Sequence, residues 1–168
     1  GFGMFVDNES KNYVIGQFSN NMLNGLGIYH YIDKGNLYKG YFKDNNMEGY
    51  GEYYYYDGNI YKGEFKNNKL EGIGIFEFSF GDKYKGEFSA DKMCGIGTYI
   101  FNDGDYHEGL YQNDVKNGYG IMYLISEKKR FEGNYINDKK NGYGEFIGDN
   151  EKIFEKGFFE NNNLINPL

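Results

Sequence analysis

Residues 61–83 read YKGEFKNNKLEGIGIFEFSFGDK, and this stretch decides the fold. Its first part, residues 61–66, alternates aromatic or glycine positions with charged ones, which is the period-two pattern of a half-buried strand. Residues 67–69, Asn-Asn-Lys, are a turn signal. Residues 72–78 alternate again, with two glycines and two phenylalanines on one face. The stretch therefore predicts a β-hairpin followed by the turn that leads into the next one.

The same pattern recurs along the chain at intervals of 23 or 24 residues. The first glycines of the Gly-x-Gly triplets are Gly1, Gly25, Gly49, Gly72, Gly95, Gly118 and Gly142. A second series, which closes triplets of the Tyr-Lys-Gly type, comprises Gly16, Gly40, Gly63, Gly86, Gly109, Gly133 and Gly157. A fixed period of this length indicates a repeat architecture, in which neighbouring units share a core. We therefore predict an all-β fold, an elongated single-layer antiparallel β-meander of stacked hairpins.

The recurring glycines have a physical explanation. A glycine inside a strand costs stability, so its repeated use marks the close approach of another group. Gly63 and Gly74 fall on the same face as Tyr61 and Phe65, so the aromatic rings can lie over the missing side chains. Each ring buries about 150–250 Å². We expect a bulky residue at either glycine to be more damaging than a change at the intervening lysines or glutamates.

Composition narrows the classes of partner. The chain carries 18 basic and 25 acidic residues, a net charge of 18 − 25 = −7. This balance excludes nucleic acid as the expected partner and argues against attraction to acidic lipid headgroups. One fifth of the residues are aromatic, which favours a folded chain. The single cysteine, Cys94, allows no intrachain disulfide and fits a reducing, cytoplasmic compartment.

No catalytic motif stands out, and we expect no enzyme activity and no required cofactor. Cys94 and His107 are the one pair with potential metal chemistry, because thiolates and imidazoles bind zinc. They fall near opposite margins of the predicted ribbon, about 20 Å apart by strand rise. One chain therefore cannot close the site, and zinc would bind only between two chains. The alternative is a buried thiol and a histidine in the place of the usual tyrosine.

One repeat is aromatic on both faces. Tyr50, Tyr54 and Tyr56 alternate with Tyr53 and Tyr55, so the first three should lie opposite the glycine-bearing face. A single-layer sheet cannot bury both of its faces alone, and we expect these three tyrosines to face a partner. The alternative is that sheet twist and long lysine side chains cover them.

Both ends of the array look unfinished. Residues 1–168 form a single array with about six complete repeats and partial units at each end. The chain starts at Gly1 inside a triplet and without methionine, so we expect a fragment of a longer protein. After Gly157 a further unit begins without a Gly-x-Gly strand, and an uncapped strand invites pairing with its own copy. We predict an antiparallel homodimer joined near the C-termini through Phe158, Phe159, Leu164 and Ile165.

These residues resemble the MORN repeat (membrane occupation and recognition nexus). The resemblance rests on Tyr61-Lys62-Gly63-Glu64-Phe65 followed by the triplet at residues 72–74, and on its recurrence over nearly the whole chain. Phenylalanine or tyrosine replaces the tryptophan of the family pattern. The composition resembles the MORN scaffold proteins of apicomplexan parasites, which organise the cytoskeleton during cell division.

The resemblance implies a non-enzymatic scaffold. We expect an elongated homodimer, cytoplasmic and cytoskeleton-associated, that holds cytoskeletal or membrane-associated proteins. Two alternatives remain, a phospholipid-binding module for membrane association and a regulatory repeat segment of an enzyme. The net charge of −7 counts against direct lipid binding.

Overall fold

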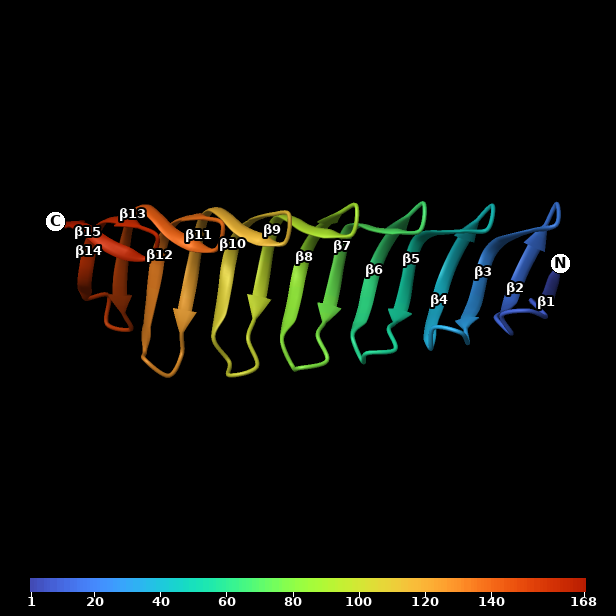
Figure 1. Ribbon diagram of the computed structural model, residues 1–168. Helices are drawn as coiled ribbons and strands as arrows, with labels where there is room; N and C mark the ends of the chain where they lie inside the picture. Colours follow the sequence, from blue (N-terminus) through green and yellow to red (C-terminus); the bar gives the residue numbers. More distant parts are fainter. The chain divides into compact units, whose positions relative to one another are not determined.

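The computed structural model describes residues 1–168, which form fifteen β-strands and no helix (Figure 1). The all-β, antiparallel fold class predicted from the sequence is confirmed. The chain divides into two compact units: Gly1–Phe80 with Phe88–Asp91, and Gly81–Glu87 with Lys92–Leu168. Strand β8 (Lys83–Ser89) contributes to both.

Within each unit the strands form a single layer in which each strand pairs with the next one along the chain. The other strands of the first unit are β1 (Phe2–Val6), β2 (Tyr13–Ser19), β3 (Met22–Tyr31), β4 (Asn36–Lys43), β5 (Asn46–Tyr54), β6 (Ile60–Lys66) and β7 (Lys69–Glu77). The other strands of the second unit are β9 (Lys92–Ile100), β10 (Tyr106–Gln112), β11 (Val115–Leu124), β12 (Lys129–Ile136), β13 (Lys139–Gly148), β14 (Ile153–Glu160) and β15 (Asn163–Pro167). This is the predicted meander of hairpins.

The hairpin turns use residues that tolerate left-handed backbone. Between β6 and β7, Asn67 and Asn68 have φ angles of 48° and 67°, the mark of a tight turn whose twist suits a hairpin. The strand register then shifts by two residues between Gly63 and Phe65. Gly72, at φ +63°, completes this bulge, so the first glycine of the triplet has a conformational role.

The second glycine of the triplet makes room for a ring. Tyr61 is 0% exposed, and its hydroxyl donates a hydrogen bond to the carbonyl oxygen of Glu64 at 3.0 Å. Its ring lies against Gly63 and Gly74: a Cβ on Gly63 would come within 2.5 Å of the Tyr61 hydroxyl. The ring makes edge-to-face contacts with Phe65 and Phe88, with centroids 5.1 Å away in each case. We call the side of each unit that carries these rings the ring face.

Successive hairpins are also joined through the second residue of each hairpin turn. The amide of Leu70 donates to Oδ1 of Asp91 at 2.8 Å, and the amide of Asp91 donates to the carbonyl of Leu70 at 3.1 Å. We call this two-bond arrangement the Asx clamp. The other clamps join Leu23 to Asn45, Met47 to Asn68, Met93 to Asp114, Lys116 to Asp138 and Lys140 to Asn162.

The opposite margin has single bonds of the same kind. Oδ1 of Asn36 accepts from the amide of Tyr56 at 2.9 Å, and Oδ1 of Asn59 accepts from the amide of Ser79 at 2.8 Å. Side-chain oxygens thus satisfy backbone amides at both ends of the hairpins, where strand pairing stops.

Candidate functional site

The side opposite the rings, here called the open face, exposes one large side chain in every Gly-x-Gly triplet. In the first unit these middle residues are Leu26, Tyr50 and Ile73, which are 52%, 59% and 61% exposed. Ile96, Tyr119 and Tyr143 take the same position in the second unit and are also exposed. Because alternate strand residues point to opposite sides, the ring face is filled while the open face is left to solvent.

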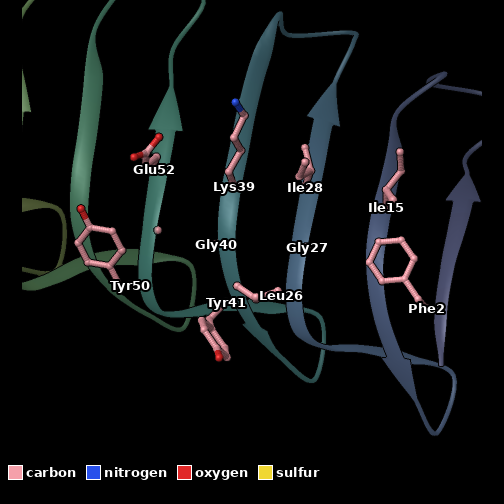
Figure 2. A pocket seen from close by; sticks show the side chains of 11 residues that line it. Phe2, Ile15, Leu26, Gly27, Ile28, Lys39, Gly40, Tyr41, Tyr50 and Glu52 are labelled. Atoms are coloured by element: carbon pink, nitrogen blue, oxygen red, sulfur yellow. The ribbon is translucent and has the colours of Figure 1, made fainter.

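In the first unit the open face forms a groove of about 500 Å³ that crosses β1 to β5 (Figure 2). Leu26 and Ile28 lie on either side of Gly27 on β3, and Lys39 and Tyr41 on either side of Gly40 on β4. The remaining lining residues are Phe2, Ile15, Tyr50, Gly51 and Glu52. A groove this rich in apolar side chains is suited to the apolar surface of another molecule.

Lys39 and Glu52 form the polar margin of this groove, and both contact Tyr54 outside it. Lys39 on β4 pairs in register with Glu52 on β5. The Lys39 ammonium lies 5.2 Å from the centre of the Tyr54 ring, and the Tyr54 hydroxyl donates to Oε2 of Glu52 at 2.5 Å. This hydrogen bond raises the pKa of Tyr54. Lys39 and Glu52 thus place opposite charges on neighbouring strands.

The three predicted partner-facing tyrosines have different positions. Tyr50 lines the groove and is largely exposed. Tyr54 lies beside it on the same strand but is half-buried and bonded to Glu52. Tyr56 is 78% exposed, but it follows the end of β5 and belongs to the turn. A contact with a partner at any of the three stays a prediction.

His107 takes the place that Tyr61 occupies in its own repeat. The imidazole is fully buried, and its Nδ1 is hydrogen-bonded to the Tyr111 hydroxyl at 2.8 Å. Nε2 has no hydrogen-bond partner, because the shorter imidazole does not reach the backbone carbonyl that a tyrosine hydroxyl reaches. Burial, with a contribution from the Lys116 ammonium, lowers the pKa of His107 to about 3.

Cys94 and His107 are not brought together. His107 pairs with Tyr99 on β9, five residues along the strand from Cys94, a separation of about 17 Å. No group of three or more histidine, cysteine, aspartate or glutamate side chains is placed to hold a metal ion. Zinc between two chains stays a prediction, and it would require the His107 imidazole to leave the core.

The residues predicted to join two chains lie on both sides of the last hairpin. Phe159 is buried against Phe131 and Tyr135, and Leu164 packs on the same cluster. Phe158 and Ile165 are exposed. The last repeat also has a second strand, β15, which pairs with β14 although β15 lacks the Gly-x-Gly triplet. Of the four residues, only Phe158 and Ile165 are free of contacts with this core cluster.

The buried histidine makes stability depend on pH. The pKa of His107 is about 3 in the folded chain and 6.5 when unperturbed, so the unfolded chain takes up a proton that the folded chain does not. Stability is therefore full above pH 6.5 and falls as the pH drops towards 3. We expect a loss of about 2 kcal/mol in unfolding free energy between pH 7 and pH 5, measured by urea denaturation.

The control for this prediction is the double variant His107→Tyr/Tyr111→Phe, which copies the Tyr61 and Phe65 pair of another repeat. It should lose about 2 kcal/mol less than the wild type over the same pH range. Equal losses in the two proteins would show that other groups cause the acid sensitivity.

Stacked hairpins, glycine-seated rings and an exposed second face define this chain as a β-repeat protein. The sequence profile of the MORN repeat matches residues 15–35, 38–60, 61–83, 84–106, 107–126 and 131–151. The chain therefore belongs to the MORN repeat family.

No curated protein matches the chain. Among solved structures, it is similar to a catalytically inactive virginiamycin B lyase from Staphylococcus aureus with quinupristin. The two are 12% identical over 94% of this chain and 69% of the other, with a TM-score of 0.23. A similarity this low bears on neither fold nor function. The structure contains no helix that is long and apolar enough to cross a membrane.

Proposed function

We propose that this chain is a non-enzymatic scaffold that binds other proteins through its open face. The observation that carries the proposal is the large exposed side chain in every Gly-x-Gly triplet, together with the apolar groove across β1 to β5. A repeat array presents such a surface at regular intervals, which suits a protein that positions several partners.

The placement of the two histidines supports a non-enzymatic role. His30 stacks on Tyr13 with ring centroids 4.5 Å apart, and His107 is buried beneath its neighbours. Both therefore serve in packing. Catalysis requires titratable groups that converge on an accessible pocket, and the charged residues that line the Figure 2 groove are Lys39 and Glu52.

The proposal includes the assembly and location expected from the sequence. The scaffold acts as an antiparallel homodimer in the cytoplasm, where it holds cytoskeletal or membrane-associated proteins of a cell-division assembly. Phe158 and Ile165 are the exposed candidates for the contact between chains. A phospholipid surface is the less favoured partner, because a chain of net charge −7 is repelled by acidic headgroups.

The experiment compares wild type with Leu26→Ser/Tyr50→Ser, which removes two walls of the groove. Affinity purification from cell extract should recover partners with the wild type and lose them with this variant. Tyr56→Ser is the matched control, because Tyr56 is exposed but lies outside the groove. Light scattering on the same samples should give about twice the chain mass of 19.5 kDa.

Co-sedimentation with phosphatidylserine vesicles separates the two partner classes. We expect little pelleting at physiological salt. Strong, salt-sensitive pelleting of the wild type, with no protein partner lost in the groove variant, would replace the protein-binding proposal with lipid binding.

A further inference from the structure

The open face of the second unit carries an apolar row that is interrupted at one strand, β12. Leu110 pairs in register with Ile96, and Tyr143 with Phe158, so these side chains share one face. Exposure in this row runs from 40% for Tyr143 to 69% for Ile96. The complete row is Ile96, Leu110, Tyr119, Tyr143 and Phe158. β9, β10 and β11 contribute neighbouring members, as do β13 and β14, while Asn134 of β12 stands opposite Tyr119 between the two groups. Exposed apolar groups of this kind mark interaction sites.

A row of carboxylates lies beside the apolar row, displaced by two residues along three of the strands, with Ile121 of β11 between Glu108 and Glu132 in register. It comprises Glu108 on β10, Glu132 on β12 and Glu145 on β13. Glu132 and Glu145 are direct cross-strand partners. Like charges placed opposite each other destabilise a sheet, so this pairing costs the fold stability.

The first unit has a different charge pattern at these positions. There Lys39, Glu52 and Lys62 follow one another across β4, β5 and β6 as direct register partners. Opposite charges alternate, with Glu52 between two lysines. At the lysine position of the first unit, the second unit has Lys85 on β8 but Glu108 on β10 and Glu132 on β12.

Two cationic residues, Arg130 and Lys156, lie near the carboxylate row, and only Arg130 forms an ion pair with one of its members. Nε of Arg130 bonds Oε1 of Glu132 at 2.6 Å, while its terminal nitrogens bind both carboxylate oxygens of Glu151. Lys156 lies opposite Glu145 in register, but the two form no ion pair. Glu108 and Glu145 therefore remain without an ion-pair partner in the chain.

We propose that the open face of the second unit binds a basic amphipathic helix of a partner protein; this rests on the proposed function as a protein-binding scaffold. Ile96, Tyr119 and Tyr143 recur once per hairpin, about 10 Å apart. Seven residues of a helix span about 10.5 Å, so apolar side chains at that spacing meet each of them. Lysines or arginines on the flank of the same helix meet the carboxylate row.

The test uses a fluorescein-labelled leucine–lysine peptide of helical periodicity, titrated with the full chain and followed by fluorescence anisotropy. E108K/E132K installs the lysines found at positions 39 and 62, so the fold is expected to tolerate it. E9K/D33K makes the same charge change, from −7 to −3, at exposed turn residues of the first unit. We expect the first variant to weaken binding at least about tenfold and the second less than about threefold.

Three outcomes overturn the proposal. Equal weakening by the two variants would mean that net charge alone attracts the peptide. If a peptide with serine in place of leucine bound as tightly as the leucine–lysine peptide, the apolar row would not contribute to binding. Equal binding of a peptide with serine for lysine would remove the basic partner and leave the protein-binding function standing. E108Q/E132Q repeats the test without adding positive charge, should the lysine variant unfold.

Discussion

Gly63→Ala should lower the free energy of unfolding by about 3 kcal/mol. The new Cβ would lie 2.5 Å from the Cα of Gly74 and 2.7 Å from the carbonyl oxygen of Ile73, as well as against the Tyr61 hydroxyl. Two of these three neighbours are backbone atoms of the paired strand, so a side-chain rotation cannot relieve the clash. The strands would have to separate at the point where the ring is seated. Urea unfolding followed by circular dichroism measures the loss.

Gly3→Ala is the matched control, because it is also a glycine in a strand. Its Cβ would meet only the Phe18 ring, at 3.6 Å, which is an ordinary contact. We expect a change within about 0.5 kcal/mol. Similar losses for Gly3→Ala and Gly63→Ala would show that glycine is not required for the close approach of the two strands.

Tyr61→Ala should cost about 4 kcal/mol of unfolding free energy, since a fully buried ring is removed from the core. The loss includes edge-to-face contacts with Phe65 and Phe88 and the hydrogen bond to Glu64. The contact with Phe88 joins β6 to the next hairpin, so amide hydrogen exchange should quicken in β8 as well as in β6. The thermal midpoint and exchange by mass spectrometry measure the two effects.

Tyr61→Phe keeps the ring and removes only the hydroxyl, so it should cost about 1 kcal/mol. Tyr56→Ala removes an exposed ring and should change stability by less than about 0.5 kcal/mol. A loss for Tyr61→Ala no larger than that for Tyr61→Phe would contradict the view that the ring is the main contributor.

The hairpins were predictable because local alternation in residues such as 61–66 reports which side chains share a face. The seating of Tyr61 on glycine followed from the same reasoning, and the structure confirms it. The Asx clamps were not foreseen. Asn68 and Asp91 lie in hairpin turns, but each side chain accepts from an amide 21 residues earlier in the chain, and local pattern carries no information on that distance.

The candidate site was predictable only in part. Alternation placed Tyr50 on the face opposite the rings, where the structure has it. The groove and the carboxylate row depend on which residues stand opposite each other across strands. That register shifts by two residues at bulges such as the one between Gly133 and Tyr135, so the pairing of Glu132 with Glu145 could not be read from spacing alone.

The Asx clamp also sets a rule for how such a chain can change its length. The amide and carbonyl of Leu70 are satisfied by the next hairpin, through Asp91, so each hairpin supplies one half of the joint to its neighbour. A deletion or insertion that breaks a repeat leaves the clamp groups of the adjoining hairpins without partners. Duplication or loss of a whole repeat keeps them paired. The Asx clamps are therefore preserved only when the chain gains or loses whole repeats, and any other insertion or deletion leaves their hydrogen bonds unmade.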